Sequence, residues 1–83
     1  MTPLDEVESK RTARVMMIDG GEGVRSHLNV LGIHIGDWVE VDVRAPFRGP
    51  ILVKVHGSRV ALGRGIARKV MVETNGQRPG RAF

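Results

Sequence analysis

The sequence predicts an all-β fold: a small five-stranded barrel with one α-helix inserted after the first strand. Two observations support this. The middle of the chain alternates between apolar and polar residues, and short segments of the same pattern recur between turns that contain Gly or Pro. The chain has 83 residues, which leaves room for one core. In so short a chain, five short strands favour a closed barrel over an open sheet, because closure removes exposed edges.

The clearest strand lies at residues 38–44, where three valines alternate with charged side chains. Val39, Val41 and Val43 are expected to face the core, since alternate residues of a strand share one face. The side chains expected to point away from the core are Glu40, Asp42 and Arg44.

Two further strands are predicted directly after this one. Residues 45–50 contain two prolines and a glycine, which indicates a loop. Residues 51–56 alternate again and form the second central strand. Gly57-Ser58 is suited to a two-residue hairpin turn, because glycine supplies the positive φ that such a turn requires. The third strand follows over residues 59–62.

Weaker strands flank this region, and one segment has a helical period. Residues 13–18 and 70–73 are expected to be short strands, the first with an ambiguous register after Met16. Apolar residues at i, i+4 and i+7 predict a helix over residues 23–31, with a left-handed cap at Gly32. The three apolar positions are Val24, Leu28 and Leu31. A single helical turn is expected within residues 63–69.

Composition excludes several classes of protein. There is no cysteine, which excludes disulfide scaffolds, thiolate zinc sites and iron–sulfur clusters and indicates the cytosol. No apolar run approaches the roughly 20 residues that span a bilayer, so the protein is not expected to be embedded in a membrane. The acidic N-terminus is not a signal peptide, and Met1 is expected to begin a complete small protein. The net charge of +4 predicts a basic face.

Several short motifs occur in an order that is specific when taken together. They are Ala13-Arg14-Val15, Gly20-Gly21, Leu31-Gly32-Ile33 with Gly36-Asp37, Ala45-Pro46-Phe47 with Gly49-Pro50, Ala61-Leu62-Gly63-Arg64, and Val70-Met71-Val72. The chain resembles the FeoA family, the small cytosolic proteins of bacterial ferrous iron uptake, over residues 4–73. It departs from the family pattern at Ser9-Lys10, where a proline-glycine pair is common. It also departs at Arg48, where a small residue is usual, and at Gly65, which replaces a better helix former.

The resemblance implies an SH3-like barrel with a helix inserted after the first strand, which forms a single domain over residues 1–73. Residues 74–83 contain Gly, Pro, Gln and Arg and are expected to be a disordered tail. It also implies a partner, the membrane protein FeoB, which carries a cytosolic GTP-binding domain and moves Fe²⁺. The expected function is that of an accessory or regulatory protein that binds this GTPase part. The protein is expected to be cytoplasmic and to be recruited to the inner face of the membrane by its partner.

No motif for catalysis is present, so the protein is not expected to be an enzyme or to carry a cofactor. There is no Gly-x-x-x-x-Gly-Lys-Ser/Thr loop for nucleotide hydrolysis and no recognisable Ser–His–Asp arrangement. Stable nucleic-acid binding is not expected, because only 4% of the residues are aromatic and bases normally stack on aromatic platforms. The alternative function is a basic SH3-like module that tracks phosphates or acts in metal-dependent regulation.

The histidines are expected to be surface residues and not metal ligands. His27, His34 and His56 have neither an i+4 partner nor a His-x-His spacing. His34 and Asp37 are weak candidates for a metal site, and a weak or transient contact with Fe²⁺ stays open.

The residues predicted to contact a partner are one phenylalanine and four arginines. Phe47 lies at the tip of a proline-flanked loop, where it either plugs one end of the barrel or anchors an interface. Aromatic and arginine side chains dominate the binding energy of protein interfaces. The arginines are Arg44, Arg48, Arg64 and Arg68. Apolar residues that the helix leaves exposed are a further candidate surface, for weak self-association.

Overall fold

A computed structural model describes residues 1–74. The predicted tail therefore lies outside the described residues, except for Thr74. The elements in chain order are β1 (Thr2–Pro3), a 3₁₀ turn η1 (Leu4–Glu6), β2 (Thr12–Ile18), α1 (Gly21–Val30), β3 (Trp38–Arg44), β4 (Ile51–Val55), β5 (Ser58–Leu62), α2 (Arg64–Ala67) and β6 (Val70–Glu73).

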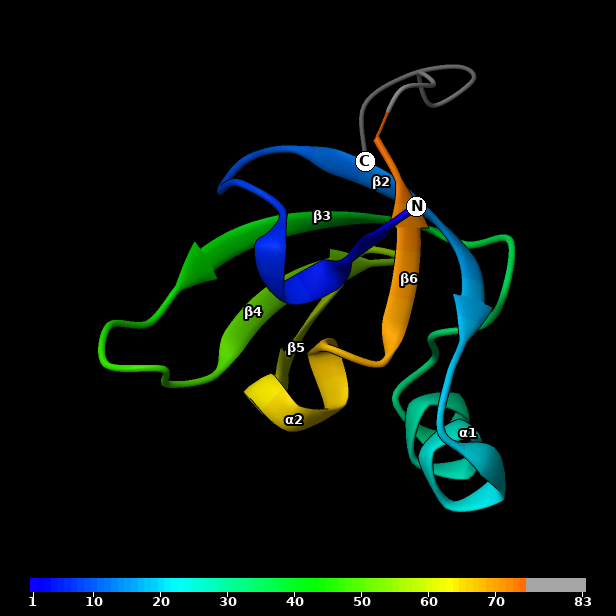
Figure 1. Cartoon of the computed structure of the whole chain (residues 1–83). Helices are drawn as coiled ribbons and strands as arrows, with labels where there is room; N and C mark the ends of the chain where they lie inside the picture. The colour runs from blue at the N-terminus through cyan, green and yellow to red at the C-terminus, as the bar shows by residue number, and fades with distance from the viewer. Residues whose placement is uncertain (75–83) are drawn as a thin grey trace.

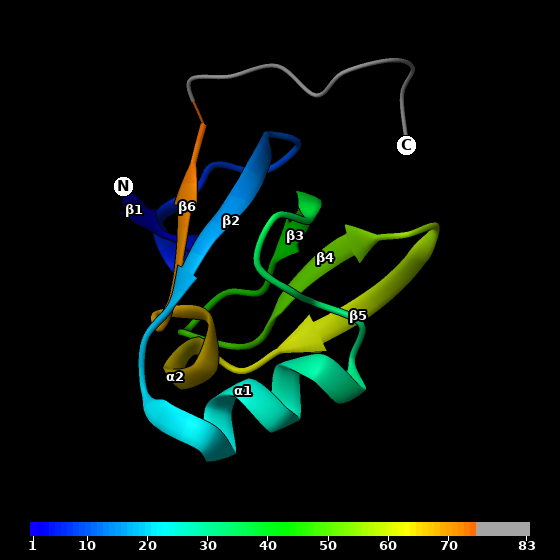
Figure 2. The ribbon, with the colours of Figure 1, turned by 90° about the vertical axis from the view of Figure 1, so that its right-hand side faces the viewer.

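The six strands form one antiparallel sheet in the order β1-β6-β2-β3-β4-β5. Figure 1 shows the sheet bending around its core, with α1 at one side and the loop between β3 and β4 at the other. Figure 2 shows α1 beyond the end of β2, as expected for a helix inserted after that strand. The predicted all-β fold is confirmed. It gains one strand, because Thr2 and Pro3 pair with Val72 and Met71.

The core is built from the inward faces of the strands and from one residue of each helical element. Leu4 of η1, Leu28 of α1 and Ala67 of α2 are fully buried. They pack against the buried strand residues, chiefly valines and isoleucines, in one cluster. In the two flanking strands the inward-facing residues are those expected. Val70 and Val72 of β6 are buried, and β2 buries alternate residues in its first half.

Two β-bulges change the register that alternation predicts. In β3 the pairing shifts between Val41 and Val43, so Val43 is 45% exposed and Asp42 is only 4% exposed. The expectation that Val43 faces the core and Asp42 faces solvent is therefore wrong. A bulge inserts one residue into the strand and so reverses the phase of the residues after it. A second bulge in β2 leaves both Met16 and Met17 exposed, which resolves the ambiguity in that strand.

The helix α1 begins two residues earlier and ends one residue earlier than predicted, whereas its cap at Gly32 is as expected. The backbone N–H of Gly32 donates to Asn29 O at 3.0 Å, and that of Ile33 donates to Leu28 O at 2.9 Å. With Gly32 at φ +86, this is a Schellman cap. The cap folds Ile33 back into the core, whereas Val30 stays 85% exposed.

The turn between β4 and β5 lies one residue earlier than predicted. Val55 pairs with Ser58, so the two turn residues are His56 and Gly57. Both have positive φ, 51° and 77°, as a type I′ turn requires. Ser58 is therefore the first residue of β5, and His56 is raised to the tip of the hairpin.

Candidate functional site

Phe47 projects from the loop between β3 and β4. Its side chain is 99% exposed, so the interpretation that it plugs the barrel is wrong. Phe47 and Arg48 both lie in the left-handed region, at φ 58 and 60. This region costs a residue with a Cβ about 1 kcal/mol. The backbone conformation of this loop is therefore unfavourable, and it leaves the apolar ring of Phe47 in solvent.

Internal hydrogen bonds brace this loop. The N–H of Ala45 donates to Pro50 O at 3.1 Å, and the N–H of Gly49 donates to Pro46 O at 3.0 Å. Glycine is required at position 49, because a Cβ there would lie 2.8 Å from that of Ala45. The backbone of the loop is therefore held together by its own hydrogen bonds, without any side chain from outside the loop.

Two of the predicted arginines position the loop and its surroundings. Arg64, at the start of α2, donates from Nε to Gly49 O at 2.9 Å and from Nη2 to Ala45 O at 3.3 Å. Arg44, at the end of β3, donates to Asp5 O at 2.6 Å and to Val7 O at 3.3 Å. Both guanidinium groups are partly committed to backbone carbonyls. Sequence reasoning did not foresee this, because the acceptors are distant in the chain.

The four predicted arginines line one pocket of about 460 Å³. The sequence reasoning missed the other two lining residues, Asp5 and Glu6, which come from η1. Arg48 and Arg68 are exposed at the rim. The Nε of Arg68 lies 4.0 Å from Asp5 Oδ2, too far for a hydrogen bond. The pocket is therefore rich in cationic N–H donors. Phe47 is the residue before Arg48, one of the four lining arginines.

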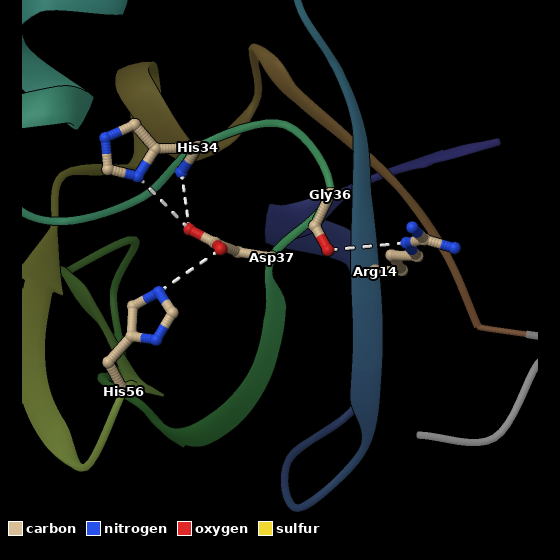
Figure 3. Close-up of polar contacts among 5 residues, drawn as sticks. All are labelled: Arg14, His34, Gly36, Asp37 and His56. Atoms are coloured by element: carbon tan, nitrogen blue, oxygen red, sulfur yellow. Dashed lines mark hydrogen bonds and ion pairs between the residues drawn. The ribbon is translucent and has the colours of Figure 1, made fainter. Parts of the chain in front are cut away.

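A second polar cluster forms where the α1–β3 loop meets the β4–β5 turn (Figure 3). Asp37 Oδ2 accepts a hydrogen bond from the backbone N–H of His34 at 2.8 Å and lies 3.3 Å from that residue's Nδ1. Asp37 Oδ1 lies 3.2 Å from His56 Nε2. The N–H of Gly36 donates to Val15 O at 2.7 Å, and the Nε of Arg14 donates to Gly36 O at 3.3 Å. The cluster thus ties the loop to β2 and to the hairpin tip.

His34 and Asp37, the weak candidates for a metal site, do lie together, and His56 joins them as a third member that was not predicted. Burial acts to raise the pKa of Asp37, but the His34 backbone hydrogen bond and the contacts with His56 outweigh it and hold the pKa below 3.8. Among residues 1–74, no three His, Asp or Glu side chains are arranged to hold a metal ion. The contacts of this cluster serve to join segments of the chain.

A third polar cluster surrounds the buried carboxylate at the β3 bulge. Asp42 accepts a hydrogen bond from Lys10 Nζ at 2.6 Å and pairs with Arg59 Nε at 3.0 Å. The hydrogen bond from Lys10 lowers the pKa of Asp42, against the effect of burial and with help from the charges of Arg59 and Lys54. Lys10 has φ 71, a conformation that favours glycine. This accounts for the departure at position 10, because a lysine there supplies the Asp42 ion pair.

Comparison with known proteins identifies a family. A model of the FeoA domain matches residues 2–74. The chain is 38% identical to a proposed Fe(2+) transport protein A of Methanocaldococcus jannaschii over 73 residues, covering 88% of this chain and 87% of that protein. The crystal structure of an iron uptake regulatory protein (FeoA) superposes with a TM-score of 0.80 at 35% identity, covering 87% of this chain and 93% of the other.

Two further structures extend the likeness. The NMR structure of an FeoA-like protein from Clostridium acetobutylicum gives a TM-score of 0.82 at 26% identity, over 99% of this chain and 95% of the other. A manganese-dependent transcriptional repressor gives a TM-score of 0.79 at 23% identity, over 87% of this chain but only 40% of the repressor. The second likeness is one of fold alone. The expected SH3-like fold is confirmed by the solved FeoA structures.

Proposed function

The chain belongs to the FeoA domain family, and we propose that it is an accessory protein of ferrous iron transport that binds the cytosolic GTPase part of an FeoB-type transporter. Family membership supports the link to Fe²⁺ transport. The proposal adds three things to family membership: binding to the transporter, a cytoplasmic location, and recruitment to the inner face of the membrane. Among residues 1–74, no helix is long and apolar enough to cross a membrane.

The observation that carries the proposal is the display of Phe47. A fully exposed phenylalanine gains about 2–3 kcal/mol when it is buried against a partner. Here the ring is carried by a loop with two residues of left-handed backbone, and Arg64 braces the backbone of that loop. A rigid aromatic side chain loses little conformational entropy on binding, so it is a favourable interface anchor. The arginines beside it are the other residue type enriched in binding hot spots.

We propose a binding role and not a catalytic one. The carboxylates at Asp37 and Asp42 are each engaged by basic side chains in contacts that hold the fold together. The alternative of phosphate tracking on nucleic acid is less well supported. Two of the four pocket arginines are committed to backbone carbonyls, which leaves few arginine donors for a run of phosphates.

The proposal is tested by immobilising this protein and titrating it with the isolated GTP-binding domain of the transporter from the same organism. Binding is measured without nucleotide, with GDP and with a non-hydrolysable GTP analogue. Saturable binding in any of these states supports the proposal. A parallel gel shift with duplex DNA at 50 and 200 mM salt tests the alternative, since binding to phosphates weakens steeply with salt. Binding to DNA with no binding to the GTPase domain would contradict the proposed function.

A further inference from the structure

We infer that the pocket lined by Arg44, Arg48, Arg64 and Arg68 is a receptor for the carboxylates of an acidic segment on the partner protein. This rests on the proposed function and names the chemistry that the partner presents. In this assignment Arg48 and Arg68 contact the carboxylates, whereas Arg44 and Arg64 are positioning residues that shape the pocket.

The two pairs of arginines are given different roles because their N–H donors have different partners. Each guanidinium carries five N–H donors in a planar fork. Arg44 and Arg64 each donate two hydrogen bonds to backbone carbonyls. Arg48 has no hydrogen bond or ion pair within the described part of the chain. Arg68 has only the 4.0 Å contact with Asp5. Both exposed guanidinium groups therefore have N–H donors available for a carboxylate, whose two oxygens match the planar fork.

The balance of charge in the pocket suits a carboxylate. Four arginines against Asp5 and Glu6 leave 4 − 2 = +2. That charge matches one or two carboxylates, and the Asp5 carboxylate already lies among these arginines. A doubly charged phosphate would match the same net charge, so the choice of a carboxylate on a protein rests on the position of Phe47 beside the pocket.

The position of Phe47 indicates that the occupant is a protein segment and not a free anion. Phe47 does not line the pocket itself, but it is the residue before Arg48, so the loop that supplies one lining arginine also presents a large exposed apolar ring. A small anion leaves the ring in water. A polypeptide that presents an acidic residue beside an apolar recess contacts both, and an apolar centre with a polar rim is the usual anatomy of an interface.

Charge reversal at the two exposed arginines, Arg48 and Arg68, tests the inference against a matched control. Arg48→Glu and Arg68→Glu are each expected to weaken binding of the GTPase domain about tenfold or more, with a reduced dependence on salt, because like charges are brought together. Arg25→Glu makes the same charge change on α1, which Figure 1 places on the opposite side of the molecule from the β3–β4 loop. It is expected to change the affinity less than about twofold.

A second measurement needs no transporter. The Nε–Hε signals of the arginines are followed by ¹⁵N NMR while acetylated tetraglutamate is added, with inorganic phosphate in a parallel titration. The signals of Arg48 and Arg68 are expected to shift with the peptide at lower concentration than with phosphate, while that of Arg25 stays still. A stronger response to phosphate would overturn the carboxylate assignment.

The two measurements separate the failures of the two proposals. If the GTPase domain binds and both reversal variants bind as tightly as the wild type, this inference is wrong while the proposed function stands. If the GTPase domain does not bind at all, the proposed function fails. In that case, absence of a peptide-induced shift at Arg48 and Arg68 would also overturn the assignment of the pocket.

Discussion

The bracing of the Phe47 loop by Arg64 can be tested through its contribution to stability. Arg64→Ala removes two hydrogen bonds, from Nε to Gly49 O at 2.9 Å and from Nη2 to Ala45 O at 3.3 Å. A hydrogen bond to a charged group contributes about 1.5–3 kcal/mol when buried. Arg64 is half-buried and one of its bonds is long, so we expect the lower end of that range and a total loss of about 2–3 kcal/mol.

That loss corresponds to a fall in Tm of roughly 10–20 °C for a chain of this size. Urea denaturation and calorimetry measure the loss, and hydrogen exchange at the Ala45 and Gly49 amides shows whether the loop has loosened. Arg64→Lys keeps the charge, but one ammonium group cannot replace a two-pronged fork, so we expect about half of the loss. Arg25→Ala, an exposed arginine on α1, is the control and is expected to stay within about 0.5 kcal/mol. Unchanged stability and unchanged exchange in Arg64→Ala would refute the bracing role.

Three further predictions concern the barrel itself. Gly65→Ala is expected to stabilise the protein by about 0.5–1 kcal/mol, because a Cβ at this helical position meets nothing within 4 Å. Gly57→Ala is expected to destabilise it, because Gly57 has φ +77. Urea denaturation that showed the opposite order of stability would contradict this. Val41→Asp places a charge at a fully buried position and is expected to abolish cooperative unfolding in circular dichroism; a folded variant would show that the core is misassigned. Because the fold lowers the pKa of Asp42 below 3.8, its ionised form stabilises the fold above about pH 4, and this contribution is lost as the pH falls through the lowered pKa. Asp42→Asn should therefore flatten the acid decline of unfolding free energy between pH 5 and pH 2, roughly the range of that titration, and an unchanged decline would refute the assignment.

Local patterns predicted most of the fold. Alternating valines identified β3 and β4, and apolar spacing with a following glycine identified α1 and its Schellman cap. These signals depend only on residues within one turn or one strand, which a sequence displays directly. The two-residue β1 was missed because it has no pattern of its own and exists only through pairing with β6.

The bulge at Val41 and Val43 could not be predicted from alternation. The phase of β3 changes where Asp42 meets Lys10 and Arg59, two residues from other parts of the chain. The favourable ion pairs at a buried carboxylate decide which side chain turns inward. Periodicity within a single strand carries no information about such partners.

The sequence predicted which residues lie at the candidate site, but not what each of them does there. The five predicted residues lie around one loop and one pocket, as expected for a contact surface. Their chemistry differs because Arg44 and Arg64 find backbone carbonyls that are 15 or more residues away. That they bind a partner stays a prediction. The joining of His56 to Asp37 was missed because it depends on the turn lying at His56-Gly57.

The most direct test of the central claim compares Phe47→Ala with Val30→Ala in binding to the isolated GTP-binding domain of the transporter. Both variants truncate an exposed apolar side chain, one on the β3–β4 loop and one on α1. We predict that Phe47→Ala weakens the affinity roughly 30-fold, about 2 kcal/mol, as expected for an aromatic hot spot. Val30→Ala should bind as the wild type does, and both variants should keep their Tm. Wild-type affinity in folded Phe47→Ala would contradict the proposal that this loop is the docking surface.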